Sequence, residues 1–333
     1  MSVVVVGAGC IGGWVGGRLA AAGVPVTLIG RQTLQAAVAR GGLVAETLGG
    51  DQARLGPGAP PVSLDASPCQ DAELIIVSVK SGATQEAGAL VRRHAPPGTP
   101  VLSLQNGLRN PERLEALLPD HPVIAGMVSF NVVWGDLPSG GVYLRQTTSG
   151  PIAIAQDAPP QVLLWMQQCG VHVHASANMR GVQWAKLILN LNNAVNALSG
   201  LPLKAELSDR GYRRVLAAAM REAWTVLDAA GVKPEPIGRM RPRLAPKILP
   251  LPDFWFRLIA APMIKIDPEA RSSMADDVAR GRRTEVQDIN GEVVRLGADV
   301  GVPTPVNAHL VKLVEGIEGP GSPRLSPDAL WPS

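Results

Sequence analysis

The stretch from Trp184 to Asn193, WAKLILNLNN, carries polar side chains whose spacing could do chemistry. On a helix of about 3.6 residues per turn, Lys186, Asn190 and Asn193 fall on one narrow stripe, while leucine and isoleucine fill the other directions. A helix that is apolar nearly all round is buried, and burial lowers the pKa of a lysine towards the range of a general acid. The stripe therefore predicts a proton donor flanked by two orienting amides. The alternative is a lysine that extends to solvent from an interface helix.

A second candidate site is the motif GAGCIG, in which Gly7, Gly9 and Gly12 follow an apolar run and open a helical pattern. In a dinucleotide-binding turn the first glycine allows the tight turn, the second admits the pyrophosphate, and the third lets the helix pack on the strand. The motif predicts that Gly7, Gly9, Cys10, Ile11 and Gly12 bind such a cofactor. The alternative is a glycine-rich turn without a ligand.

Three further polar residues end predicted strands. Arg31 closes the second strand, where an NAD-selective site usually offers an acid, and its guanidinium matches a 2′-phosphate in charge and geometry. This residue favours NADP(H) over NAD(H). Lys80 and Asn106 end later strands, at the edge where open α/β sheets bind ligands. A solvated arginine, a solvent-facing lysine and an ordinary Asn-Gly turn are the alternatives.

The elements that must position these residues alternate in the first half of the chain. The β-branched runs SVVVVG, VPVTLIG, AELIIVSVK, TPVLSLQNG and HPVIAGMVSF are separated by helical patterns, which predicts βαβ units on a parallel sheet. From about Trp134 to Ala155, glycines punctuate the pattern and predict antiparallel or mixed strands that close this sheet. After about Ala177 the strand signals end.

The second half of the chain predicts helices only. They are expected at Gln183–Leu198, Ser208–Ala230, Pro268–Arg280 and Thr284–Asp299, with an irregular segment at Pro234–Pro252. The fold class is therefore α/β, with an N-terminal Rossmann-type dinucleotide-binding domain followed by an all-helical C-terminal domain. We expect an NADP-binding domain at 1–176, a helical substrate and catalytic domain at 177–320, and a loose tail at 321–333.

The composition of the chain limits the kinds of partner and cellular environment that we expect. The chain has 333 residues, 46% of them hydrophobic, and a net charge of only +3, which suits a globular protein and excludes nucleic acid as a partner. No run of about eighteen apolar residues is free of glycine and charge, so no membrane span is expected. The apolar N-terminus lacks the basic region of a signal peptide. Three widely spaced cysteines favour a reduced, cytoplasmic protein. His172 and His174 lack a third ligand nearby, so no metal site is predicted.

Several motifs taken together resemble one family. The turn GAGCIG with Arg31, the strand-end Lys80, the tripeptide QNG, the segment WAKLILN and the segment SSMADDVARGRRTEVQDINGEVV occur in the order found in ketopantoate reductases, also called 2-dehydropantoate 2-reductases. The resemblance extends from Val3 to about Leu310. It implies a Rossmann domain and a helical domain with the active site in the cleft between them. It also implies NADPH-dependent reduction of the 2-keto group of ketopantoate to pantoate, a step of pantothenate synthesis.

The resemblance implies roles for individual residues. Lys186 would be the general acid, Asn190 would orient the substrate and hold Lys186, and Asn106 and Lys80 would lie near the nicotinamide and the substrate. Ser273 would bind the substrate carboxylate and Glu285 would accept a hydrogen bond from a substrate hydroxyl. Without the resemblance, Ser273 and Glu285 would be interpreted as residues that begin or cap helices.

This sequence departs from the family pattern at two positions. Many members place an asparagine eight residues after the lysine, where this chain has Ala194, and we expect Asn193 to take its place. Some members have an asparagine where Ala270 lies. These changes leave open a second hypothesis, reduction of another branched or hydroxylated 2-keto acid. A non-catalytic NADP-binding sensor is a third. The sequence leaves the oligomeric state open, a homodimer included.

Overall fold

The computed structural model describes residues 2–235, 242–260, 269–317, 319–321 and 323–332. The chain divides into two compact units, Met1–Val182 and Gln183–Ser333. Among the described helices none is long and apolar enough to cross a membrane.

The division between the units falls inside helix α6 (Met179–Asn190) and not at the predicted Ser176. The reason is packing, because Met179 and Val182 share a buried cluster with Met127 and Ala153 of the first unit. The first turn of α6 therefore belongs to the core of the first unit.

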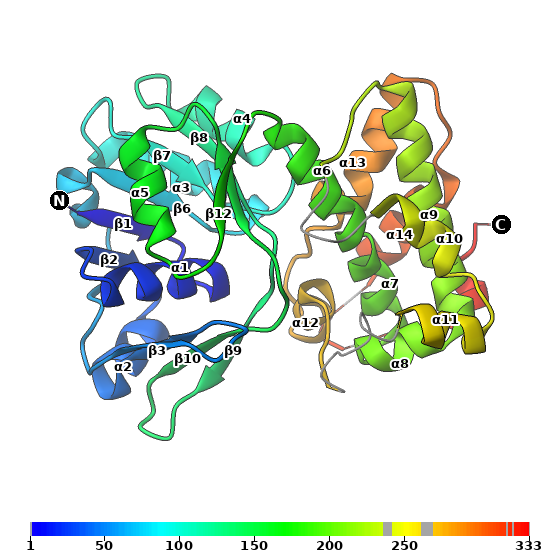
Figure 1. Cartoon of the computed structure of the whole chain (residues 1–333), viewed down its shortest axis with the longest axis horizontal. Coiled ribbons are helices and arrows are strands. Elements are labelled where there is room, and N and C mark those ends of the chain that lie inside the picture. The colour runs from blue at the N-terminus through cyan, green and yellow to red at the C-terminus, as the bar shows by residue number, and fades with distance from the viewer. Residues whose placement is uncertain (1, 236–241, 261–268, 318, 322, 333) are drawn as a thin grey trace. The chain divides into compact units, whose positions relative to one another are not determined.

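The first unit is built on an eight-stranded sheet in the order β12-β11-β8-β7-β6-β1-β2-β5 (Figure 1). Its strands are β1 (Val3–Val6), β2 (Val26–Ile29), β5 (Val62–Ser63), β6 (Leu74–Val77), β7 (Val101–Ser103), β8 (Val123–Val128), β11 (Ile152–Ala155) and β12 (Val173–Ser176). The strands from β8 to β5 pair in parallel, and their order reverses between β1 and β6 as in a Rossmann fold. The predicted fold class is confirmed.

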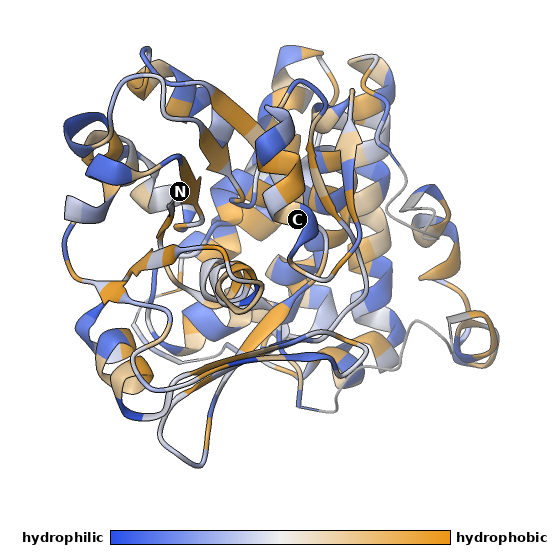
Figure 2. Ribbon diagram, turned by 60° about the vertical axis from the view of Figure 1, so that its left-hand side comes forward, coloured by the Kyte–Doolittle hydropathy of each residue, from blue (hydrophilic) through white to orange (hydrophobic). Residues whose placement is uncertain are grey.

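Helices cover both faces of this sheet. They are α1 (Cys10–Ala21), α2 (Gln32–Gly41), α3 (Thr84–His94), α4 (Asn110–Leu117) and α5 (Pro160–Gln167). Val3 and Val5 of β1 lie in one core with residues of α1, α2 and α5, whereas Val4 and Val6 lie in another with α3 and α4. Alternate side chains of a strand point to opposite faces, so β1 is apolar throughout because both faces are buried. Figure 2 shows the hydrophobic residues along the strands.

A second sheet corrects one prediction. Strands β4 (Gln52–Leu55), β3 (Leu43–Glu46), β10 (Val142–Gln146) and β9 (Val132–Asp136) form a separate four-stranded sheet in that order. Only β11 joins the large sheet, antiparallel to β8. The expectation that the whole region from Trp134 to Ala155 closes the large sheet is therefore wrong. The glycine pattern predicts strands but not their partners, and β10 pairs with the distant β3.

The second unit is helical. After α6 come α7 (Asn192–Ser199), α8 (Leu203–Ser208), α9 (Arg210–Ala229), α10 (Ala245–Ile248), α11 (Asp253–Ala260), α12 (Ser273–Ala279), α13 (Val286–Asp299) and α14 (Pro305–Glu315). The predicted helices Ser208–Ala230 and Thr284–Asp299 correspond to α9 and α13. The predicted helix Pro268–Arg280 is shorter, since α12 begins only at Ser273, and Pro268 lies outside the described residues. The segment predicted to be irregular contains α10 in its described part, whereas residues 236–241 lie outside the described residues.

The predicted helix Gln183–Leu198 is interrupted at Leu191, where α6 ends and α7 begins one residue later. The interruption contains neither proline nor glycine. Asn190, Asn192 and Asn193 surround it, and asparagine is a poor helix former because its side chain competes for backbone groups. Leu191 itself keeps helical backbone angles, φ −56° and ψ −25°, and its N–H donates to the Leu187 carbonyl at 3.0 Å. Lys186 and Asn190 therefore share α6, whereas Asn193 belongs to α7.

The predicted loose tail is also corrected. The Leu325 N–H donates to the Leu198 carbonyl at 3.0 Å, and the Tyr212 hydroxyl donates to the Leu325 carbonyl at 2.8 Å. Leu330 is fully buried. Within the described part of the tail, hydrogen bonds and an apolar anchor hold the chain against the helical unit.

Candidate active site

The glycine turn joins β1 to α1. Gly7 has a φ of +97°, a conformation that glycine adopts without strain. The N–H groups of Gly7 and Ala8 donate to the Ile29 carbonyl of β2 at 3.3 and 3.2 Å. A Cβ on Gly7 would lie 2.5 Å from the Val79 side chain. A larger residue would fit neither the backbone conformation nor the space.

The other two glycines differ in what surrounds them. A Cβ on Gly12 would collide with the Ser78 hydroxyl and the Gly7 carbonyl, so α1 packs closely on the turn. A Cβ on the exposed Gly9 would meet no described atom within 4 Å. Gly9 is the N-cap of α1 and offers no side-chain cap, and the first helical turn, which begins with Cys10 and Ile11, contains no acidic residue. This open helix N-terminus fits the pyrophosphate of a dinucleotide.

Arg31 lies where the sequence predicts the 2′-phosphate contact. It follows β2 directly after Gly30, is exposed, and is the N-cap residue of α2. Since β2 is the parallel neighbour of β1, Arg31 and the glycine turn lie at the same edge of the sheet. A guanidinium at this place has the charge and the fork geometry for a phosphate.

Lys80 and Asn106 lie at that same edge. Lys80 is exposed and precedes the short helix η2 (Ser81–Ala83) after β6, and Asn106 is half-buried after β7. β6 pairs with both β1 and β7 in parallel. The fold therefore brings the four strand ends that carry the predicted cofactor residues together.

A buried polar cluster beneath these residues was missed by the sequence analysis. Asn110, 1% exposed, donates from Nδ2 to the Ser81 hydroxyl at 2.9 Å and to the Asn106 carbonyl at 2.5 Å. Thr84 donates to Asn110 Oδ1 at 3.0 Å and accepts from Gln105 Nε2 at 2.8 Å. The cluster ties the loop after β6 to the loop after β7. Its only signal in the sequence is the polar run QNGLRN, which also suits an ordinary turn.

Lys186 of α6 is the predicted general acid, and it lies in the helical unit. It is 7% exposed among apolar neighbours, Trp184 at 1% and Leu187 at 2%. Burial lowers the pKa of Lys186 from 10.5 to about 8, because the charged form loses its hydration. At neutral pH this ammonium is protonated yet can release its proton, as a general acid must.

The two predicted orienting amides are accessible. Asn190 follows Lys186 by one helical turn on α6, and Asn193 lies in the first turn of α7; both side chains are half-buried. The Asn193 carbonyl accepts a hydrogen bond from the Ser272 hydroxyl at 3.4 Å. This bond joins α7 to the segment that carries Ser273.

Neither Ser273 nor Glu285 caps a helix through its side chain. The cap of α12 is Ser272, whose hydroxyl accepts from the Ala275 N–H at 3.1 Å, and Ser273 is exposed. Glu285 is the N-cap residue of α13, but its side chain accepts no cap hydrogen bond. By position, however, Ser273 is the first residue of α12 and Glu285 is the N-cap residue of α13, so both lie at helix N-termini as the alternative interpretation expects.

Asn196 and Glu206 form a second buried cluster that the sequence analysis missed. Both are fully buried, and Asn196 Nδ2 donates to Glu206 Oε2 at 2.8 Å. Asn196 Oδ1 accepts from the Ser272 N–H at 2.9 Å. The helical wheel places Asn196 away from Lys186, and an acid in LPLKAELS gives no sign of burial.

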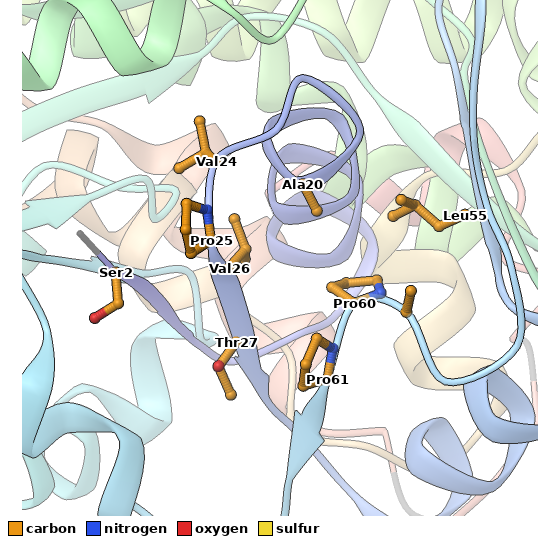
Figure 3. A pocket seen from close by; sticks show the side chains of 10 residues that line it. Ser2, Ala20, Val24, Pro25, Val26, Thr27, Leu55, Pro60 and Pro61 are labelled. Carbon is orange, nitrogen blue, oxygen red and sulfur yellow. The ribbon is translucent and has the colours of Figure 1, made fainter.

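A surface pocket lies elsewhere in the first unit (Figure 3). Val24, Pro25, Pro60 and Pro61 contribute to its lining, together with Ser2. These residues precede β1, β2 and β5 and so lie at the amino ends of the strands. This pocket is remote from the edge that carries the glycine turn.

The fold and the glycine turn define a dinucleotide-binding protein. The family description "Ketopantoate reductase PanE/ApbA" matches residues 3–157, and its C-terminal counterpart matches residues 178–318. The chain belongs to the ketopantoate reductase family, and a nicotinamide dinucleotide is its cofactor class.

Individual relatives match along almost the whole length. A 2-dehydropantoate 2-reductase from Halobacterium salinarum is 31% identical, covering 94% of this chain and 98% of the relative. A 2-dehydropantoate 2-reductase from Pyrococcus horikoshii is 28% identical, covering 96% and 99%. The crystal structure of a PanE/ApbA family ketopantoate reductase from Ralstonia eutropha superposes with a TM-score of 0.77 at 34% identity, covering 95% and 98%. D-mandelate dehydrogenase with NADH, 20% identical over 99% of each chain, shares the fold with a TM-score of 0.74.

Proposed function

We propose that this protein reduces the 2-keto group of ketopantoate to pantoate with NADPH, a step of pantothenate synthesis. Family membership over both units supports the reaction. The observation that carries the mechanism is the buried Lys186, whose lowered pKa of about 8 suits an acid at neutral pH. NADPH, when bound, supplies the hydride.

On the Rossmann unit, the open turn at Gly9 and the N-terminus of α1 would receive the pyrophosphate. Arg31 would hold the 2′-phosphate, which is the basis for proposing NADPH over NADH. Lys80 and Asn106 would hold the nicotinamide end, since β6 pairs with β1 and β7 pairs with β6, so both strand ends lie along the edge that carries the glycine turn.

On the helical unit, Lys186 would donate a proton to the carbonyl oxygen as negative charge develops there. Asn190 and Asn193 would orient the substrate through their amides. Ser273 would bind the carboxylate of the keto acid, and Glu285 would accept a hydrogen bond from a substrate hydroxyl. A ketone carbonyl is a poor hydride acceptor unless its oxygen is protonated or hydrogen-bonded, so this division of roles meets the need of the reaction.

A different 2-keto acid is the second candidate. Ala194 is fully buried and offers no polar group, where many family members have an asparagine. A substrate whose polar groups are arranged differently from those of ketopantoate fits this difference. The sensor hypothesis predicts cofactor binding without turnover.

The decisive experiment mixes the purified protein with NADPH and ketopantoate and follows the absorbance of the reduced cofactor. Oxidation of NADPH with formation of pantoate supports the proposal. Activity restricted to other 2-keto acids would contradict ketopantoate as the substrate and support the second candidate. NADPH binding without turnover on any keto acid would favour the sensor. Light scattering on the same preparation distinguishes a monomer from a homodimer. The cytoplasmic location we propose agrees with the three cysteines, all described, forming no disulfide.

A further inference from the structure

The buried amide of Asn196 uses both its donor and its acceptor groups. Its Nδ2 donates to the Leu201 carbonyl at 2.9 Å and to Glu206 Oε2 at 2.8 Å, and its Oδ1 accepts from the Ser272 N–H at 2.9 Å. The side chain is 0% exposed, so no solvent replaces a lost partner. A buried group left unpaired is costly, which makes the positions of all three partners depend on this one amide.

One bond of Asn196 reaches the segment that precedes α12. The Ser272 N–H is held by Asn196, and the Ser272 hydroxyl donates to the Asn193 carbonyl of the same helix α7 at 3.4 Å. Two residues earlier, the Ala270 carbonyl accepts from the Leu203 N–H at 2.8 Å. The backbone from Ala270 to Ser272 is therefore fixed to α7 and to the start of α8. Ser273 follows directly and is exposed.

Glu206 supports the amide from the other side. It is fully buried, and burial raises its pKa to about 8, so that it is a neutral acid at neutral pH. Its Oε2 accepts from Asn196 and, more weakly at 3.5 Å, from Asn192. Asn192 and Asn196 are one helical turn apart and share the face towards Glu206, whereas Asn193 points about 100° away from Asn192. The asparagines of α7 therefore divide between two faces.

We propose that Asn196 is a positioning residue that, held by Glu206, sets the place of Ser273 relative to the helices bearing Lys186, Asn190 and Asn193. This inference rests on the proposed function, in which Ser273 binds the carboxylate of the keto acid. Asn196 touches neither substrate nor cofactor in this scheme. It acts through the backbone of Ser272.

The test compares Asn196→Ala with the wild type in steady-state kinetics. Loss of one buried hydrogen-bonded amide should raise KM for the keto acid about ten- to a hundredfold, with KM for NADPH unchanged. Asn307→Ala is the matched control, because Asn307 is equally buried in the same unit and bonded to the Ala219 carbonyl and Glu222, not to α12. It should lose stability without the change in KM. Equal KM values in the two variants would overturn the proposal.

Two further variants separate positioning from general damage. Asn196→Asp keeps an acceptor for the Ser272 N–H but loses the donor to the Leu201 carbonyl and to Glu206, so its KM should lie between those of the wild type and Asn196→Ala. In the double variant Asn196→Ala with Ser273→Ala, the effects should not add, because the first acts through the second. Additive effects would overturn the inference. If Asn196→Ala folds poorly, Asn196→Ser, which leaves a smaller cavity, carries the same comparison.

Hydrogen exchange makes the outcome independent of turnover. The amides of Ser272 and Ala275 should exchange faster in Asn196→Ala and at the wild-type rate in Asn307→Ala. If the wild type reduces no 2-keto acid, the proposed function fails on its own assay. Faster exchange in Asn196→Ala would then show that Asn196 fixes the Ser272 backbone, but that this contact has no role in binding a carboxylate. Unchanged exchange of these amides in Asn196→Ala would show that Asn196 does not fix the Ser272 backbone.

Discussion

Reduction by this protein should slow above about pH 8, because Lys186 must be protonated to donate to the developing alkoxide. The side chain is 7% exposed. The fall in its pKa from 10.5 to about 8 corresponds to roughly 3 kcal/mol in favour of the neutral amine. Above this pKa, kcat for reduction should fall about tenfold for each pH unit.

The reverse reaction should depend on pH in the opposite direction. Oxidation of the hydroxy acid needs Lys186 as a base, so its rate should rise with pH and level off above about pH 8. Lys186→Arg keeps a group that stays charged, and it should remove the alkaline fall in whatever reduction rate remains. Lys186→Ala should keep NADPH binding and lose about two to four decades of kcat.

We would measure kcat across the pH range in both directions of the reaction. Lys312→Ala, which changes an exposed lysine, is the control. These profiles decide whether Lys186 is the general acid. An alkaline limb near the usual pKa of 10.5 would show that burial does not tune Lys186. Full activity in Lys186→Ala, or an equal loss of NADPH binding, would show that this lysine is not the acid.

Three other predictions concern the cofactor turn and the buried acid. Arg31→Ala should weaken NADPH binding about tenfold or more and leave NADH binding unchanged in fluorescence titrations, since a charged hydrogen bond is lost; equal losses for both would contradict the 2′-phosphate role. Gly9→Ala should keep the wild-type melting temperature but bind NADPH poorly, because the added methyl meets no described atom yet lies where the phosphate must approach. Gly12→Ala should lower the melting temperature, because its methyl collides with Ser78. Calorimetry that shows the reverse order of melting temperatures refutes this assignment. Glu206 has a pKa of about 8 in the folded chain against 4.5 unfolded, so its stabilising contribution should be present below pH 4.5 and be lost as pH rises to about 8. Urea unfolding of Glu206→Gln should lack that slope, and an identical slope in variant and wild type would contradict the buried neutral acid.

The features that the sequence predicts well have local causes. A strand apolar at every position, followed by glycines at fixed spacing, requires burial on two faces and a tight turn. The parallel order around β1 then follows from the handedness of successive βαβ units. Lys186 within an apolar helical pattern is local in the same sense, since the pattern itself reports burial.

The features that the sequence does not predict depend on distant partners. β10 pairs with β3 rather than with a neighbour in the chain, and no periodicity encodes that choice. The interruption at Leu191 arises where asparagines weaken a helix that proline and glycine leave intact. The tail is held at Leu325 by Tyr212 and Leu198, which lie more than a hundred residues earlier. In each case the missing information is tertiary contact, which propensity cannot supply.

Exposure separates two kinds of asparagine in the helical unit. A side chain that binds substrate must be reachable, and Asn190 and Asn193 are half-buried. A side chain that only holds the backbone gains strength from the exclusion of water, and Asn196 and Asn307 are fully buried with protein partners. Polar residues on one apolar helical pattern therefore do not share one role. The half-buried amides are reachable, whereas the fully buried Asn196 is bonded to the backbone of Ser272. In the proposed scheme Asn196 therefore positions the neighbouring Ser273 and touches no substrate itself.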